Sequence, residues 1–234
     1  MSLKVNYPWS YIVKLLLTSD FPLSRNEIIL EHIRSKGSNP RIAWIPPFSK
    51  EGHERFPKAK ESFKSFGFTN LDFIDIDEDL DERQLDYLNK YDVIYLTGGN
   101  PISFKQNILQ SGLESHLLNL IVEDTLIMGA SGGSMQFTKN VSLFRLVTET
   151  VEQVIREHPN YEGLNIVNYE FLPHYNSMES SFIEKVSEYS KGIDHDIVSI
   201  TDGSAIFHNN NEIFYIGDTV IFHDGEMITI NDIT

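Results

Sequence analysis

The sequence contains no cysteine in its 234 residues. This absence excludes disulfide bonds, thiolate metal sites and a cysteine nucleophile, and it fits a reducing compartment. We expect a cytoplasmic protein. No cofactor and no bound metal ion are expected.

Long hydrophobic runs are also missing. The most apolar stretch near the start, YIVKLLL at 11–17, is interrupted by Lys14 and is too short for the apolar core of a signal peptide. No run approaches the roughly 20 apolar residues that a membrane-spanning helix requires. We expect neither a signal segment nor a membrane span.

Positive charge is scarce, since 19 lysines and arginines face 34 aspartates and glutamates, for a net charge of −15. A surface of this sign repels nucleic acids and anionic membranes, so we expect neither as a partner. The chain is long enough to bury roughly 70–75% of the surface that it exposes when unfolded. These features are typical of a globular protein with a solvated acidic surface.

Strand-like and helix-like segments alternate over the first 131 residues. Such alternation predicts a mostly parallel central sheet with helices on both faces. The predicted strands cover residues 11–19, 41–48, 71–77, 92–100 and 125–131. The predicted helices cover residues 24–36, 53–66, 80–90 and 102–122.

Shorter strands follow residue 140. A strand over 164–176 precedes a helix over 178–191, and turns at 209–211 and at Asp224-Gly225 separate further strands. Asp-Gly between two strands is a strong hairpin signal, so short antiparallel strands are expected at the C-terminal end. No linker or repeat interrupts the sequence, and we expect one α/β domain over residues 1–234.

Small residues surround Ser131. Gly129-Ala130-Ser131-Gly132-Gly133 fits G-x-S-x-G, in which a strand turns sharply into a helix and presents a nucleophilic serine. The alternative is a tight structural turn around a buried serine. The preceding predicted strand favours the catalytic interpretation, with Ser131 as nucleophile.

One of the eight histidines stands out as a candidate base. His174 directly follows a predicted strand, where α/β sheets place their functional sites. Asp202 ends the next predicted strand, so Ser131, His174 and Asp202 could meet at one sheet edge as a catalytic triad. The competing interpretation of Asp202-Gly203 is a simple turn. The other histidines fall in stretches that we expect to be solvated or helical: His32, His53, His116, His158, His195, His208 and His223.

A second glycine turn, Gly98-Gly99, ends a predicted strand just before Pro101. Amides exposed at a helix start can bind an anion. We therefore predict that the N–H groups of Gly99 and Gly132 form an oxyanion hole, the alternative being a plain turn.

Taken in order, these motifs resemble the dipeptidase E (aspartyl dipeptidase) family of serine peptidases. The matching features are G-G-N after a strand, G-x-S-x-G about thirty residues later, then P-H-Y, then D-G. The resemblance implies a class I glutamine-amidotransferase-like fold, Ser131 as nucleophile and His174 as base. The order Ser…His…acid also differs from that of α/β-hydrolases.

The sequence departs from the family pattern at two site positions. Gly132 stands where the family usually has alanine, and Asp202 stands where it often has glutamate. An acid shortly after the nucleophile has also been proposed in the family, and Glu149 is the nearest carboxylate here. The triad acid is therefore open between Asp202 and Glu149.

The resemblance implies hydrolysis of short peptides through an acyl-enzyme, with cleavage after an N-terminal aspartate as the family's specificity. Asn100 and Arg145 are the candidate substrate-binding residues, although Arg145, like Lys139, could be ordinary surface charge. Two alternatives remain: a cyanophycinase-like amide hydrolase and a catalytically silent binding protein. A small peptide is the expected partner, and the sequence leaves a homodimer open.

Overall fold

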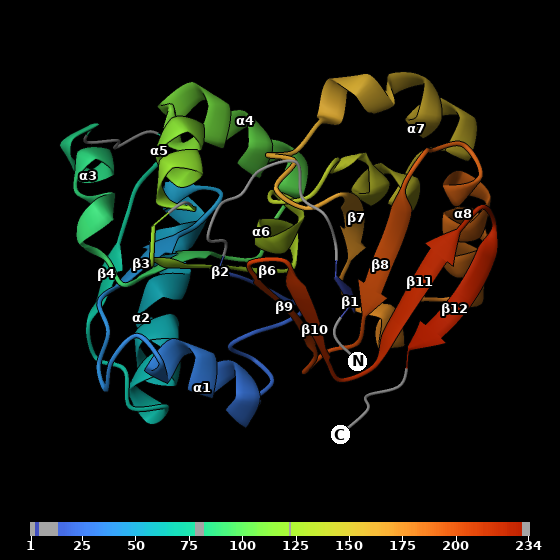
Figure 1. The fold of residues 1–234 in the computed structure, drawn as a ribbon. Coiled ribbons are helices and arrows are strands. Elements are labelled where there is room, and N and C mark those ends of the chain that lie inside the picture. The colour runs from blue at the N-terminus through green and yellow to red at the C-terminus, as the bar shows by residue number, and fades with distance from the viewer. Residues whose placement is uncertain (1–2, 5–13, 78–81, 122, 231–234) are drawn as a thin grey trace.

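The described part of the chain forms two β-sheets with helices packed around them (Figure 1). The computed structural model describes residues 3–4, 14–77, 82–121 and 123–230. The strand predicted over 11–19 and the helices predicted over 80–90 and 102–122 lie partly outside these residues. Within them, the predicted alternation of strands and helices is confirmed.

The larger sheet has eight strands in the order β1-β10-β9-β2-β6-β5-β3-β4. The five strands from β2 to β4 in this order run parallel, and β9, β10 and β1 continue the sheet with each strand antiparallel to its neighbour. Thr18 pairs with Ala130, which aligns the carboxyl ends of β2 and β6. The strand bounds are β1 Leu3–Lys4, β2 Lys14–Thr18, β3 Ile42–Ile45, β4 Leu71–Phe73, β5 Val93–Leu96, β6 Leu126–Ala130, β9 Ala205–Asn209 and β10 Glu212–Ile216.

The smaller sheet has four strands in the order β12-β11-β8-β7, bounded as β7 Tyr169–Leu172, β8 Asp196–Ile200, β11 Thr219–His223 and β12 Glu226–Ile230. β7 and β8 are parallel, and β11 and β12 form the predicted hairpin. Asp224 and Gly225 have φ values of 47° and 81°, the left-handed pair that a tight hairpin needs. The predicted C-terminal antiparallel strands are confirmed, but they divide between the two sheets.

The helices correspond to the predicted segments with two instructive differences. α2 begins at Ser49 rather than at residue 53, because the Asp77 carboxylate accepts the Ser49 N–H at 3.0 Å and caps the helix from outside. The segment predicted as one helix over 102–122 contains two helices, because Gly112 adopts φ 76° and ends the first. The helices are α1 Glu27–Arg34, α2 Ser49–Ser65, α3 Glu82–Asp86, α4 Pro101–Ser111, α5 Leu113–Leu120, α6 Gly132–Met135, α7 Val151–Glu157 and α8 Ser180–Ser190, with 3₁₀ turns η1 Leu88–Lys90, η2 Ser142–Val147, η3 His158–Tyr161 and η4 Tyr175–Ser177.

Apolar side chains fill both faces of the larger sheet. Leu15 and Leu17 face one hydrophobic cluster and Leu16 faces the other, and all three are fully buried. Residues of α4, α5 and the smaller sheet belong to the first cluster, and residues of α1 and α2 belong to the second. Burial on both faces is the pattern of a layered α/β fold, as predicted. The first cluster also joins the two sheets.

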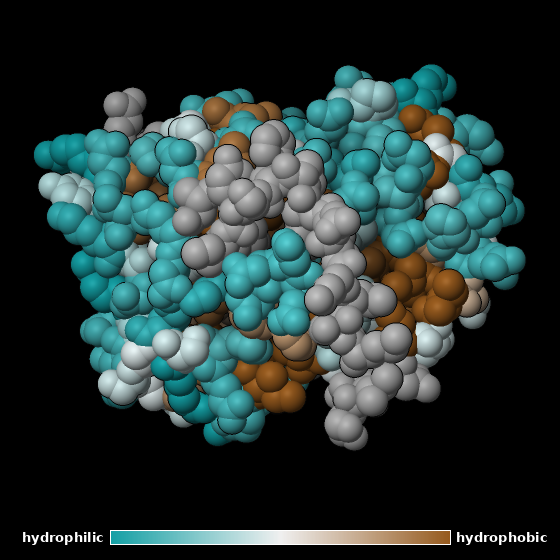
Figure 2. Space-filling view, viewed as in Figure 1, coloured by the Kyte–Doolittle hydropathy of each residue, from teal (hydrophilic) through white to brown (hydrophobic). Residues whose placement is uncertain are grey.

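The outer surface in Figure 2 is mostly hydrophilic, with brown patches over the lower ends of β9 and β10 and over the smaller sheet. Scattered exposed apolar residues are normal for a globular protein. Among the described residues, no helix has both the length and the apolar character to cross a bilayer.

Candidate active site

Ser131 lies at a sharp turn between β6 and α6. Its φ of 50° and ψ of −119° are strained for a residue with a side chain, and the Ser131 N–H donates to the Thr18 carbonyl at 3.0 Å. The strand before the serine and the helix after it are those that the G-x-S-x-G pattern predicts. The turn holds the hydroxyl at the carboxyl edge of the larger sheet.

The glycines around Ser131 are required by close backbone approach. A Cβ at Gly129 would lie 2.5 Å from the Ser134 nitrogen, and one at Gly133 would lie 2.2 Å from the Leu96 carbonyl oxygen. A Cβ at Gly132 would lie 2.1 Å from the Gly99 carbonyl oxygen. The small residues therefore let β6, α6 and the end of β5 pack backbone against backbone.

His174 follows β7 and reaches the serine. Its backbone is left-handed, with φ 62°, at the start of η4. Its backbone N–H donates to Ser19 Oγ at 2.8 Å, and its ring Nε2 lies 3.0 Å from Ser131 Oγ. The imidazole is positioned to accept the serine proton.

Asp202 follows β8 and contacts the other imidazole nitrogen, with Oδ1 2.7 Å from His174 Nδ1. Burial raises the pKa of the Asp202 carboxyl, but hydrogen bonds from Ser19 and His174 outweigh it, so the pKa is lowered overall. Asn176 accepts the Asp202 N–H at 2.8 Å and holds the turn in place. The carboxylate is therefore ionised at neutral pH and faces the imidazole.

The way in which the three residues meet differs from the expectation of a single sheet edge. Ser131 follows a strand of the larger sheet, whereas His174 and Asp202 follow the parallel neighbours β7 and β8 of the smaller sheet. The expectation was wrong on this point because β7 and β8 pair with each other and with β11, and not with the strands of the larger sheet. The residues converge where the two sheets face each other.

Ser19 is a site residue that sequence reasoning missed. Its hydroxyl donates to Asp202 Oδ1 at 2.6 Å, accepts the His174 N–H and lies 3.3 Å from His174 Nδ1. The side chain is fully buried directly after β2. A polar Thr-Ser-Asp run ending an apolar strand was the available signal, because parallel strands place such residues at the functional edge.

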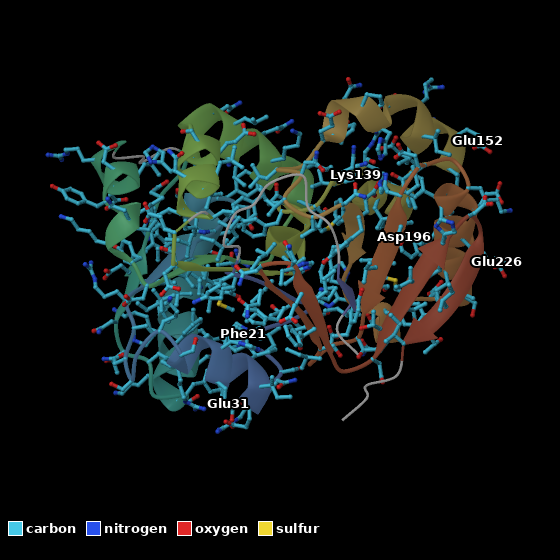
Figure 3. The ribbon with its side chains drawn as sticks, in the orientation of Figure 1. Phe21, Glu31, Lys139, Glu152, Asp196 and Glu226 are labelled. Atoms are coloured by element: carbon cyan, nitrogen blue, oxygen red, sulfur yellow. The ribbon has the colours of Figure 1, made fainter. Side chains whose placement is uncertain are left out.

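A pocket of about 470 Å³ opens beside Ser131 and His174, a size suited to a small ligand. Phe21, labelled in Figure 3, belongs to its apolar wall together with Pro22, Leu23, Trp44, Ala59, Tyr95 and Ala130. Charged residues of both signs also line it: Asp20, Glu54, Arg55 and Lys58. Arg55 Nη1 donates to the Gly98 carbonyl at 3.0 Å, so this guanidinium is held near the serine turn.

The two predicted oxyanion-hole residues lie close together, Gly132 at the start of α6 and Gly99 just before α4. Gly132 is the first residue of α6, so its N–H has no acceptor within the helix. Gly99 immediately precedes Asn100, the N-cap residue of α4, and its carbonyl lies against Gly132. Both glycines are therefore next to Ser131 in space.

The structure places the two predicted substrate-binding residues elsewhere. Asn100 Oδ1 accepts the N–H groups of Ile102 and Ser103, and thereby caps α4. Arg145 is buried in ion pairs with Glu149 and Glu157. Among the described residues, neither Asn100 nor Arg145 lines the pocket, so their expected role is corrected to a structural one.

The same ion pair bears on the choice of triad acid. Glu149 Oε1 accepts from Arg145 Nε at 2.8 Å, whereas Asp202 contacts His174. Lys139, the other basic residue near the elbow, faces Asp194 at 3.8 Å and is also outside the pocket lining. Of the two candidate acids, only Asp202 contacts the histidine within the described residues.

Two of the histidines expected in solvated stretches are buried. His195 is 7% exposed and His208 is fully buried. Burial lowers the pKa of His208 to about 3, and its Nε2 lies 2.7 Å from the Tyr169 hydroxyl. Local sequence did not reveal this, because both positions are covered by elements distant along the chain.

Comparison with known proteins identifies the family that this sequence matches. A model described as peptidase family S51 matches residues 15–216. The uncharacterized peptidase Lmo0363 of Listeria monocytogenes serovar 1/2a is 31% identical over 128 residues, which cover 54% of this chain and 60% of that protein. The uncharacterized peptidase Lin0382 of Listeria innocua is 29% identical over 129 residues, which cover 51% of this chain and 60% of that protein. The match thus spans about 60% of the length of these curated relatives.

Two solved structures show the same fold. A protein of Listeria monocytogenes EGD-e, provisionally named as a peptidase E, superposes with a TM-score of 0.67 at 24% identity, covering 87% of this chain and 98% of the other. A peptidase from an acI-B1 actinobacterium superposes with a TM-score of 0.70 at 17% identity, covering 96% of each chain. The expected fold class is confirmed by these likenesses.

Proposed function

The chain belongs to peptidase family S51, and from this membership we propose that it hydrolyses short peptides as a serine exopeptidase. The observation that carries the proposal is the continuous contact from Ser131 Oγ through His174 to Asp202, at 3.0 Å and 2.7 Å. A nucleophile, a base and an orienting acid within hydrogen-bond reach form the arrangement used in acyl transfer.

In the proposed reaction, Ser131 Oγ attacks the peptide carbonyl carbon while His174 Nε2 takes the hydroxyl proton. The tetrahedral intermediate collapses as His174 returns this proton to the leaving amine, which leaves an ester on Ser131. A water molecule, deprotonated by His174, then attacks the ester and restores the serine. Asp202 keeps the proton on Nδ1, so that Nε2 is free to act as base.

The negative oxygen of the intermediate needs donors that are already in place. We assign this role to the N–H groups of Gly132 and Gly99, because Gly132 starts α6 and Gly99 lies against it. One such donor is typically worth about 10²–10³ in rate. Both donors come from the backbone, so the role does not depend on alanine at position 132.

The pocket supports a small substrate with free ends. Asp20 and Glu54 offer negative charge for an N-terminal amine, and Arg55 and Lys58 offer positive charge for a carboxylate. Charges of both signs in about 470 Å³ suit a dipeptide better than a long chain. This is why we propose an exopeptidase acting on dipeptides.

Cleavage after an N-terminal aspartate forms the most specific part of the proposal. This specificity requires a cation that binds the side-chain carboxylate of the aspartate. Arg55 and Lys58 line the pocket and are the candidates for this role in place of Arg145. Lys58→Ala should then raise KM for Asp-containing dipeptides more than for their Asn counterparts, which lack the carboxylate charge.

The decisive experiment is labelling of the native protein with a fluorophosphonate, followed by a dipeptide library. The proposal predicts modification at Ser131, loss of labelling in Ser131→Ala, and hydrolysis of at least one dipeptide. Labelling with hydrolysis only of aspartate-containing polymers would favour a cyanophycinase-like hydrolase. No labelling and no hydrolysis would leave a binding protein and overturn the proposal.

A further inference from the structure

Two histidines and a glutamate converge at the end of the smaller sheet away from the serine. His158 starts η3, Glu170 lies in β7, and His195 immediately precedes β8. Both His158 Nε2 and His195 Nε2 lie 2.9 Å from Glu170 Oε1. In Figure 3 the labels of Lys139 and Asp196 mark this upper end of the sheet, while Phe21 of the peptide pocket lies below.

This cluster is largely removed from water. The side chains of Glu170, His195 and His158 are 0%, 2% and 21% exposed. A carboxylate in such a place is costly unless positive charge or several hydrogen-bond donors compensate it. Of the three side chains, that of His158 is the most exposed to solvent.

The hydrogen bonds at Glu170 are crowded onto one atom. Its Oε1 lies within 3.0 Å of His158 Nε2, His195 Nε2 and the Tyr189 hydroxyl, whereas Oε2 contacts Tyr189 alone among the described residues, at 3.2 Å. The carboxylate has about four lone-pair sites, so it can accept all three donors when Tyr189 bonds to Oε2. A cation between the two imidazoles and Oε1 would replace two of these donors, because each Nε2 would then offer a lone pair instead of a proton.

The geometry points to a binding site for one divalent transition-metal ion, zinc by ligand preference, with His158 Nε2, His195 Nε2 and Glu170 Oε1 as ligands. Two imidazoles and one carboxylate are a common zinc ligand set, completed by water. The three ligand atoms lie within 4.8 Å of one another. The missing cysteines exclude only thiolate ligands, so they do not bear on this set of imidazoles and a carboxylate.

Ring positions agree with one shared ion. Two imidazoles bound to zinc at about 2.0–2.1 Å have ring centroids about 5–6 Å apart. The centroids of His158 and His195 are 5.7 Å apart. Asp194 Oδ1 lies 2.8 Å from His195 Nδ1, a carboxylate contact that directs Nε2 toward a metal.

The ion would stabilise the fold and would not take part in hydrolysis. Glu170 lies near the start of β7, whereas His174 follows the end of that strand, so the two residues lie toward opposite ends of β7. The site would connect η3 to the starts of β7 and β8. His174 and Asp202 follow the other ends of these two strands. Metal binding can therefore be measured without any peptidase assay, and its failure would leave the proposed function untouched.

The test is titration of chelator-treated protein with Co²⁺, followed by displacement with Zn²⁺. We expect one Co²⁺ per chain with visible ligand-field absorption, displacement by zinc, and a zinc-dependent rise in melting temperature. His158→Ala and Glu170→Gln should each weaken binding more than about 100-fold, since changes at outer-shell partners alone cost about 10–100-fold. His223→Asn is the matched control, because this exposed histidine of the same sheet pairs with Asp196.

Circular dichroism of each variant checks that folding is retained, and the partly exposed His158 is the position that best tolerates replacement. If Glu170→Gln does not fold, the Co²⁺ titration is made with His158→Ala and His195→Asn instead. Absence of stoichiometric Co²⁺ binding in wild type, or equal binding by wild type and His158→Ala, would overturn the proposal.

Discussion

At the scale of single residues, the first prediction concerns the hydroxyl of Ser131. Ser131→Ala should abolish hydrolysis and leave the melting temperature close to that of wild type, because the hydroxyl contacts His174 and not the core. Assays with the best dipeptide and thermal melts monitored by circular dichroism check both parts. More than a few per cent residual activity would remove Ser131 from the nucleophile role.

The two candidate acids make different predictions. Asp202→Asn should lower kcat by orders of magnitude with little change in KM, because an amide favours the wrong imidazole tautomer; in one serine protease the loss was roughly 10⁴. Glu149→Gln should cost less than about tenfold, since Glu149 pairs with Arg145. Steady-state kinetics of both variants give the ranking. The reverse ranking would exclude Asp202 as the acid.

Ser19 should act by positioning the other two groups. Ser19→Ala removes a donor to Asp202 and an acceptor for the His174 N–H, so kcat should fall about tenfold or more while KM changes little. Ser115→Ala, an exposed serine of α5 that bonds only locally to the Gly112 carbonyl, is the control. An unchanged kcat in Ser19→Ala would show that the histidine and the acid hold their places without it.

At the scale of elements, the prediction concerns the packing of α6 on β5. Gly133→Ala places a Cβ 2.2 Å from the Leu96 carbonyl oxygen and 2.5 Å from that of Thr97, so backbone must move. We expect a loss of about 1–3 kcal/mol in the free energy of unfolding. Gly98→Ala is the control, because its Cβ would meet nothing closer than 3.4 Å. Urea unfolding that ranks the two variants equally would contradict this account.

At the scale of the whole molecule, His208 of β9 contacts Tyr169 of β7 between the two sheets, and its burial there should make stability depend on pH. The pKa of buried His208 is about 3 against 6.5 for an ordinary histidine, so in acid the unfolded chain binds a proton that the folded chain does not. The stabilising contribution is present above pH 6.5 and is lost as pH falls toward 3. Between pH 7 and pH 5 the loss is about 2 kcal/mol.

The comparison of wild type with His208→Gln isolates this contribution. Glutamine keeps an acceptor for the Tyr169 hydroxyl but does not titrate, so the variant should lose about 2 kcal/mol less than wild type between pH 7 and pH 5. His223→Gln, at an exposed position, should behave like wild type. Urea unfolding at the two pH values measures the difference. Parallel losses in wild type and His208→Gln would show that His208 is protonated in the folded protein.

Local sequence determined the main turns and the order of the elements. The glycines around Ser131, the Asp224-Gly225 hairpin and the strands that precede Ser131, His174 and Asp202 were all predicted. Each depends on a short stretch of chain, in which the period of apolar residues and the presence of glycine restrict the backbone. The order of these motifs was sufficient to indicate the family.

Tertiary structure alone decided which distant elements meet. It joined β7 and β8 in a second sheet, brought buried Ser19 between His174 and Asp202, paired Arg145 with glutamates outside the pocket, and buried His195 and His208. A side chain's partners depend on strand pairing and packing between residues far apart in sequence, and these free energies are not encoded in the local period. The sequence thus predicts where the chain turns, and the packing of the two sheets decides what each turn faces.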